Sequence, residues 1–180
     1  MSSSPDPSKP SIQNRLAKSQ ALVFDLAEII PAGERVVFDL KDWLHEGIIL
    51  KEKKFRTHVQ EHNWETYEGK NVAVLCSEDV VIPTWAYMIV VAHLAPFARV
   101  VICGSLEALE QEMFRKAIAR VDLEPYIGRS VVIRGCSNPD IPYFAYGEAT
   151  RILSPLAKLI KFGEPCSSVP VYKQPKDGKS

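Results

Sequence analysis

Apolar runs that are rich in β-branched residues alternate with longer helix-forming stretches in the second half of the chain. The runs at 71–76, 99–103 and 129–136 are typical of buried strands. Between and after them, segments 84–95, 105–120 and 143–153 have the apolar spacing or the boundary residues of helices. This alternation predicts parallel strands joined by right-handed helical crossovers. Segment 156–162 fits either a last strand or a further helical turn.

The first half of the chain contains a short repeated sequence, an echo of four residues: Val23-Phe-Asp-Leu26 recurs as Val37-Phe-Asp-Leu40 after a turn at 31–33. Alternation within each segment predicts strands, and their closeness in sequence predicts a hairpin or a pair of edge strands. Asp25 and Asp39 would then share one face, either as solvated side chains or as an acid–base pair. Segment 41–67 is polar and predicts a helix followed by a loop anchored by Trp64.

Together these patterns predict an α/β fold: a single domain over residues 14–173, with a mainly parallel sheet, flanking helices and an N-terminal β extension. A chain of 180 residues is long enough to bury a substantial core. Residues 1–13 and 174–180 lack the apolar side chains that a core needs, so we predict disordered tails there.

Charge and hydropathy exclude several classes of partner. Lysine plus arginine equals aspartate plus glutamate at 22 each, so no global field favours nucleic acid or an anionic membrane. The longest apolar stretch, 80–97, is interrupted by Pro83, His93 and Pro96, which favours a core helix over a membrane span. The N-terminus has no apolar signal segment, so we expect a cytoplasmic protein with reduced thiols.

The four cysteines follow the ends of the apolar runs, at intervals of 27, 33 and 30 residues. Parallel strands would bring such positions to the carboxyl edge of the sheet, where open α/β folds bind ligands. Cys76, Cys136 and Cys166 each precede a serine, and we predict them as thiolate ligands of a metal ion, with Glu164 as an oxygen ligand. Zinc is the expected metal for such a site. Cys103 is assigned to packing.

Other interpretations of the same residues remain open. The cysteines could be small apolar residues that end buried strands, or one could be the nucleophile of a thiol-dependent enzyme. Trp85 and Tyr87 either form the wall of a pocket beside Cys76 or belong to the core. The function favoured by the pattern is binding of a metal ion or small ligand, and the alternative is an oligomeric interaction protein, such as a homodimer. The pattern does not decide whether the protein is an enzyme.

Histidines add one weak motif. His58-Val-Gln-Glu-His62 matches H-x-x-E-H, in which two histidines one turn apart can hold zinc beside a glutamate base. The polar surroundings favour an ordinary exposed helix instead. His93 is expected as a core histidine bonded to a backbone carbonyl. The chain has no Cys-x-x-Cys pair, dinucleotide fingerprint, phosphate loop or nucleophile elbow.

Three longer strings carry a family resemblance: Glu34-Arg-Val-Val-Phe-Asp-Leu-Lys-Asp-Trp-Leu44, Pro83-Thr-Trp-Ala-Tyr-Met88 and Phe162-Gly-Glu-Pro-Cys-Ser-Ser-Val-Pro170. With these strings the chain resembles the bacterial family called domain of unknown function 2480 over about residues 12 to 173. The resemblance extends to Cys76, Cys136 and Cys166 and is weaker at Cys103 and His58. It implies no particular reaction.

Overall fold

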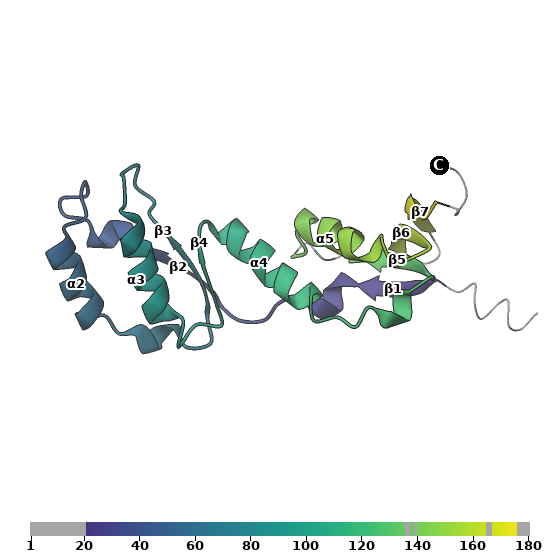
Figure 1. The fold of residues 1–180 in the computed structure, drawn as a ribbon, viewed down its shortest axis with the longest axis horizontal. Coiled ribbons are helices and arrows are strands. Elements are labelled where there is room, and N and C mark those ends of the chain that lie inside the picture. Colours follow the sequence, from purple (N-terminus) through teal and green to yellow (C-terminus); the bar gives the residue numbers. More distant parts are fainter. Residues whose placement is uncertain (1–20, 136–137, 139, 165–166, 176–180) are drawn as a thin grey trace, which may run out of the picture. The chain divides into compact units, whose positions relative to one another are not determined.

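The computed structural model describes residues 21–135, 138, 140–164 and 167–175, and the chain divides into two compact units (Figure 1). One is a single stretch of sequence, Pro31–Lys116, and is called here the continuous unit. The other combines Met1–Ile30 with Ala117–Ser180 and is called the split unit. No helix in the described residues is both long enough and apolar enough to cross a membrane.

The continuous unit contains a parallel three-stranded sheet in the order β2-β3-β4. In chain order its elements are β2 (Arg35–Asp39), η2 (Leu40–Trp43), α2 (Glu52–Glu61), η3 (Trp64–Tyr67), β3 (Asn71–Leu75), α3 (Thr84–Leu94), β4 (Val100–Cys103) and α4 (Leu106–Ile118), whose last two residues belong to the split unit. The η elements are short 3₁₀ helices. β3 is the central strand, and its residues from Asn71 to Val74 are buried.

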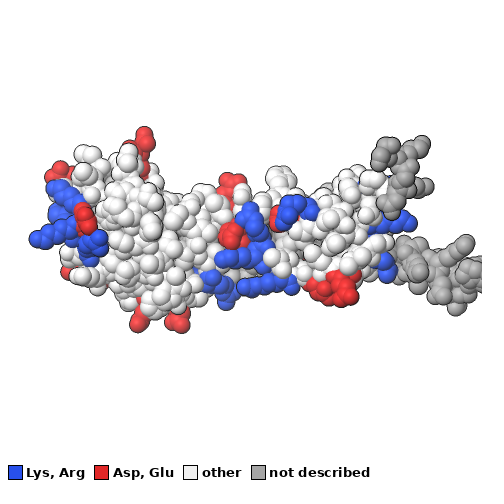
Figure 2. Space-filling model, viewed as in Figure 1, with Lys and Arg blue, Asp and Glu red and all other residues white. Residues whose placement is uncertain are grey.

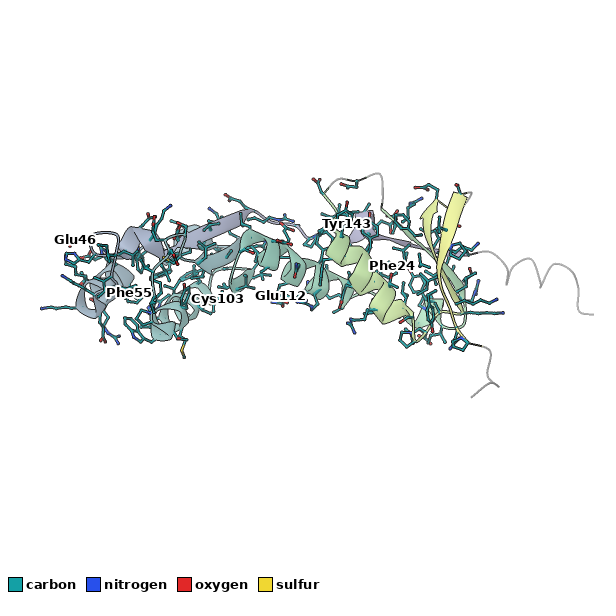
Figure 3. The ribbon with its side chains drawn as sticks, turned by 90° about the horizontal axis from the view of Figure 1, so that it is seen from above. Phe24, Glu46, Phe55, Cys103, Glu112 and Tyr143 are labelled. Atoms are coloured by element: carbon teal, nitrogen blue, oxygen red, sulfur yellow. The ribbon has the colours of Figure 1, made fainter. Side chains whose placement is uncertain are left out.

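Helices cover both faces of this sheet, with α2 and α3 on one side and α4 on the other (Figure 1). On the first face Val72 and Val74 join a core that includes Phe38 from β2 and Phe55 from α2 (Figure 3). On the second face α4 contributes a smaller cluster, which consists of Ala73, Val100, Leu109 and Met113 with Ile102 against it. The strictly alternating side chains of β3 therefore serve two cores.

The split unit contains a four-stranded sheet in the order β1-β5-β6-β7. Its elements are β1 (Leu22–Asp25), η1 (Leu26–Ile29), η4 (Glu124–Tyr126), β5 (Ser130–Arg134), α5 (Tyr143–Leu153), β6 (Leu159–Glu164) and β7 (Ser167–Lys173). β1, β5 and β6 are parallel, and β7 is added antiparallel to β6. Of the two inner strands, β5 contributes Val131, Val132 and Ile133 to the buried residues.

The two sheets repeat one another in register. β2 pairs with β3 so that Phe38 lies opposite Val74, and β1 pairs with β5 so that Phe24 lies opposite Ile133. Asn71 lies opposite Val100 across β3 and β4, and its counterpart Ser130 lies opposite Leu159 across β5 and β6. The central strand, helix and following strand of one unit thus recur 59 positions later in the other.

Sequence identities at the same offset of 59 mark this internal repeat. They include Tyr67 and Tyr126, Gly69 and Gly128, Ile82-Pro83 and Ile141-Pro142, Tyr87 and Tyr146, Pro96 and Pro155, and Gly104 and Gly163. Backbone geometry agrees: φ is +70° at Gly69 and +67° at Gly128, and each amide bonds to the carbonyl 28 positions later, in Phe97 or Leu156. The two units are therefore two versions of one fold within a single chain.

The structure confirms the α/β class, the mainly parallel strands and the flanking helices, with the strands divided between two sheets. It also confirms helices at 84–94, 106–118 and 143–153, and it resolves 159–164 as a strand. The predicted tail 1–13 lies outside the described residues, as does 176–180 of the second tail. Within that second tail, the Gln174 amide bonds to the Lys158 carbonyl at 3.0 Å.

The predicted pairing of the two Val-Phe-Asp-Leu segments is wrong. They form β1 and β2, which are edge strands of different sheets, and each pairs with the central strand of its own unit. The echo arises because each unit of the repeat has its own copy of this strand. Asp25 and Asp39 consequently have parallel but separate roles, since each caps the 3₁₀ helix that follows by accepting a hydrogen bond from the amide two residues later, at 3.0 Å.

Candidate functional site

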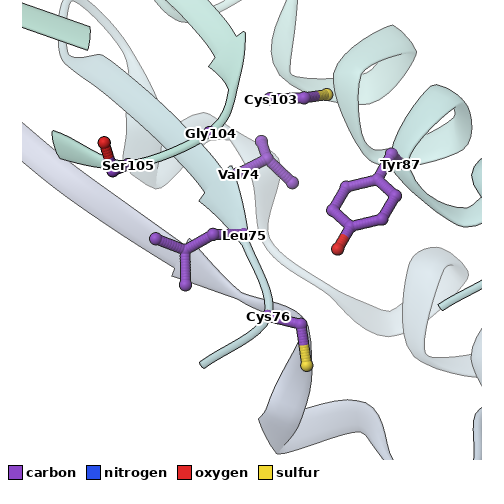
Figure 4. Close-up of a pocket in the computed structure, with 7 residues that line it drawn as sticks. All are labelled: Val74, Leu75, Cys76, Tyr87, Cys103, Gly104 and Ser105. Atoms are coloured by element: carbon purple, nitrogen blue, oxygen red, sulfur yellow. The ribbon is translucent and has the colours of Figure 1, made fainter. Parts of the chain in front are cut away.

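A pocket of about 490 Å³ lies at the carboxyl edge of the β2-β3-β4 sheet (Figure 4). Its lining consists of Val74, Leu75, Cys76, Tyr87, Cys103, Gly104 and Ser105, all in the continuous unit. Two thiols and one phenol are thus the distinctive groups in an otherwise small and apolar lining. For brevity it is called the thiol pocket.

The lining residues are placed by the ends of β3 and β4. Val74 and Cys103 are direct neighbours in the parallel register, so both side chains lie on the face covered by α3. Cys76 follows the end of β3 and packs against the same core. α3 begins directly after Pro83, and its first turns bring Tyr87 beside the two strand ends (Figure 4).

Burial keeps the Tyr87 phenol and the Cys103 thiol of the pocket uncharged at neutral pH. Burial raises the pKa of the Tyr87 phenol, and the nearby Cys76, Cys103 and Asp39 raise it further. Burial also raises the pKa of the Cys103 thiol, although the residue as a whole is exposed. Both groups therefore remain protonated and present hydrogen-bond donors rather than a thiolate or a phenolate.

Asp39 lies close enough to raise the pKa of Tyr87, and its carboxylate is held by backbone amides. Its Oδ1 accepts hydrogen bonds from Lys41 N and Ser77 N, each at 3.0 Å, and Lys41 Nζ lies 3.6 Å from Oδ2. The hydrogen bonds with Ser77 and Lys41 lower the pKa of Asp39, although burial opposes that shift. Asp39 therefore holds the segment after Cys76 in place and stays ionised.

The corresponding place in the split unit has different side chains. At the offset of 59, Tyr146 stands for Tyr87, while Phe162 replaces Cys103 and Gly135 replaces Cys76. The Phe162 ring packs edge-on against Tyr146, with 5.6 Å between ring centroids. The space that the small Cys103 side chain leaves open in one unit is thus occupied by an aromatic ring in the other.

The residues predicted as metal ligands belong to both units of the chain. Cys76 follows β3 of one sheet, whereas Cys136 follows β5 of the other, so the single sheet edge that motivated the prediction is divided in two. Cys136 and Cys166 lie outside the described residues. Glu164 ends β6, with its Oε2 4.0 Å from an Arg134 nitrogen. The described part of the chain contains no group of three or more His, Cys, Asp or Glu side chains able to hold a metal, and the zinc site stays a prediction.

Cys103 is the residue that the sequence analysis missed. Assigned to packing, it is exposed and lines the thiol pocket with Cys76. The signal that identifies it is the internal repeat, which aligns it with a phenylalanine. Of the two aromatic residues considered for the pocket wall beside Cys76, Tyr87 does line the pocket. Trp85 packs instead against Phe55 of the core, with 5.4 Å between ring centroids.

The histidines lie away from this pocket lining. His58 is exposed on α2, as expected, and His62 is half-buried against Trp64, where burial lowers its pKa. His93 Nδ1 lies 2.8 Å from the Ile89 carbonyl, so the expected backbone bond is confirmed, but the side chain is exposed rather than part of the core.

Comparison with known proteins identifies a family. The family model described as "Protein of unknown function (DUF2480)" matches residues 10–174 of the 180-residue chain. The chain belongs to the DUF2480 family. No curated protein and no solved structure matches it. For this DUF2480 protein the pocket geometry and the internal repeat are therefore the observations from which a function can be argued.

On the face shown in Figure 2, several acidic side chains of the DUF2480 protein stand beside basic ones, and other acidic groups stand apart from them. Ion pairs link Arg115 with Glu112 and Arg151 with Glu148, each at 2.7 Å. Close pairing of opposite charges reduces the field that a polyanion would encounter at these helices.

We expect Cys103 of the DUF2480 protein to react slowly with iodoacetamide at neutral pH, because its raised pKa leaves little thiolate. The rate should continue to rise through the pH range in which an ordinary cysteine reaches its plateau. Mass spectrometry of the tryptic peptide 100–115 would measure it, with the same peptide in denatured protein as the control. A plateau below pH 8 would contradict the protonated thiol.

Proposed function

We propose that the continuous unit binds a small, mainly apolar ligand in the thiol pocket. The volume of about 490 Å³ falls within the range of about 300–1,000 Å³ that is typical of small-molecule sites. The lining contains no lysine, arginine, aspartate or glutamate, so a strongly charged ligand would lose its hydration without gaining a partner. A neutral ligand with one or two polar atoms suits these walls.

The polar groups of the lining can orient such a ligand. The Tyr87 phenol and the Cys103 thiol are protonated, so each can donate a hydrogen bond to a ligand. The Ser105 hydroxyl already accepts from the Ala108 amide at 3.2 Å, where it caps the start of α4. At Cys103, binding is favoured over nucleophilic catalysis because a nucleophilic cysteine needs a lowered pKa, and burial shifts the pKa of this thiol in the opposite direction.

The observation that carries the proposal is the contrast between Cys103 and Phe162. Both residues are the last register-paired position of the third parallel strand, Cys103 in β4 and Phe162 in β6, and each stands beside an equivalent tyrosine. The fold therefore accommodates a phenylalanine at this position, and the continuous unit has a small thiol there instead.

The test uses this contrast directly. The neutral probe 2-naphthol is titrated into the full-length protein, and binding is followed by the amide NMR shifts of Leu75, Gly104 and Ser105. Cys103→Phe should pack against Tyr87 as Phe162 packs against Tyr146, and so close the pocket. We expect it to weaken binding at least about tenfold while the protein stays folded.

Cys103→Ser is the matched control, because it keeps the small side chain and should retain binding. Near-wild-type melting of Cys103→Phe would show that the loss is local. Equal affinity of Cys103→Phe and wild-type protein, or shifts that never saturate in the wild type, would overturn the proposal.

A further inference from the structure

The outer edge of β4 is open in the described residues of the continuous unit. The sheet ends at β4 in the order β2-β3-β4. Gly104 donates its amide to the Val74 carbonyl at 2.9 Å, so Gly104 faces β3. Because the backbone groups of successive strand residues face opposite sides, those of Ile102 also face β3, whereas the N–H and C=O groups of Val101 and Cys103 face outward.

Helices cover the faces of this sheet and not this edge. α3 packs on one face through the core that contains Val74 and Val101. α4 packs on the other face, and the bond from Arg35 Nε to Glu110 Oε1, at 2.6 Å, directs it from the end of β4 toward β2. An open strand edge flanked by two covered faces is suited to adding one more strand.

The internal repeat shows which strand fits. In the split unit β6 corresponds to β4, and β7 covers its outer edge in antiparallel orientation. Phe162 lies opposite Val169 and Ile160 lies opposite Tyr172. Pro170, which has no N–H to donate, lies opposite Lys161, whose backbone faces β5, so no bond is lost there.

We propose that the β4 edge binds an extended, β7-like peptide segment of a partner protein as an added antiparallel strand. Its residues would pair with Val101 and Cys103 as Tyr172 and Val169 pair with Ile160 and Phe162. Side chains directly opposite in an antiparallel pair share a face, so the residue opposite Cys103 would lie at the thiol pocket. We expect a β-branched apolar residue of the peptide opposite Cys103, because Val169 occupies the corresponding position opposite Phe162. Strand addition is a recurrent mode of peptide recognition.

This inference does not depend on small-molecule binding, because the backbone edge remains whether or not the pocket holds a ligand. The probe is a synthetic peptide with the sequence of residues 167–174, Ser-Ser-Val-Pro-Val-Tyr-Lys-Gln, added to the full-length protein. Hydrogen exchange of backbone amides is followed by NMR. We expect exchange at Val101 and Cys103 to slow several-fold, with no change at Ile102 and Gly104, whose amides already face β3.

Methylated peptides supply matched controls. N-methylation of the first valine or of the tyrosine blocks an amide that should bond to β4, and each should abolish protection. N-methylation of the lysine should have no effect, because Lys173 lies opposite Leu159 and its amide faces away from β6. In the wild-type protein, peptide protection without saturable 2-naphthol shifts, or the reverse, separates failure of the pocket proposal from failure of this inference.

Two outcomes would overturn the assignment. Protection at Val101 and Cys103 that grows with protein concentration alone would show that a second copy of the chain occupies the edge. Unchanged exchange at both amides with the peptide in large excess would show that the edge does not accept this strand.

Discussion

Replacing Trp64 by alanine is expected to lower the free energy of unfolding of the continuous unit by about 3–5 kcal/mol, the usual cost of truncating a buried aromatic side chain. Trp64 is only 9% exposed and stacks on Phe38, with 5.6 Å between ring centroids and 12° between ring planes. The rings of His62 and His93 pack against it, with 4.7 and 5.1 Å between ring centroids. Its indole nitrogen donates to the Val59 carbonyl at 2.9 Å, and that acceptor would lose its partner.

Tryptophan fluorescence makes this measurement specific. All three tryptophans, Trp43, Trp64 and Trp85, belong to the continuous unit. Urea unfolding followed by fluorescence therefore reports that unit, and Trp64→Ala leaves two tryptophans as probes. Leu123→Ala is the matched control, since Leu123 occupies the equivalent position in the split unit and is half-buried. A loss below about 1 kcal/mol for Trp64→Ala would contradict its central role in this core.

Local pattern was sufficient for most elements. α5 begins and ends at the predicted residues, 143 and 153, because Pro142 precedes its first turn and the Ser154-Pro155 step follows its last. Ser105 caps α4, at the start of the predicted helix 105–120, with the Ala108 amide donating to its hydroxyl. In these places neighbouring residues alone determine the backbone conformation.

Strand partners could not be predicted in the same way. β1 and β2 are close in sequence and carry the same four letters, which indicated a hairpin, yet their partners are β5 and β3. β1 and β5 are about 100 residues apart, and hydrophobic alternation contains no information about such a pairing. The offset of 59 between Ile82-Pro83 and Ile141-Pro142 was the available signal, since it implies that each unit needs its own edge strand.

The candidate site illustrates the same limit. The rule that ligands bind at the carboxyl edge of parallel strands directed attention to Cys76, which lines the thiol pocket, whereas Tyr87 was left open between a pocket wall and the core. It could not divide the strands at 71–75 and 130–134 between two sheets, because the rule assumes one continuous sheet. Cys103 was taken as packing because a cysteine that ends an apolar run resembles a small core residue. Only comparison with Phe162 shows that the side chain here is smaller than the fold permits.

Gly135→Ala is the second substitution for which we expect a large effect, here in the split unit. Gly135 has φ +145°, a backbone conformation that is strained for any residue with a side chain. An added Cβ would also lie 2.8 Å from Ile141 Cδ1 and 3.2 Å from Leu26 Cβ. Backbone strain of about 1–3 kcal/mol and overpacking of similar size should together lower the stability of this unit by about 2–5 kcal/mol.

Gly128→Ala separates the two contributions to that loss. Gly128 also has positive φ, at +67°, but no atom lies within 4 Å of its added Cβ, so it should lose only the conformational part, about 1 kcal/mol. Differential scanning calorimetry of both variants would measure the difference, since the split unit contains no tryptophan. Gly135 and Cys76 are counterparts in the repeat, and only the glycine has positive φ. Equal losses of stability for Gly135→Ala and Gly128→Ala would show that Ile141 and Leu26 move aside. Close packing at Gly135 would then not explain why the split unit has a glycine where the continuous unit has Cys76.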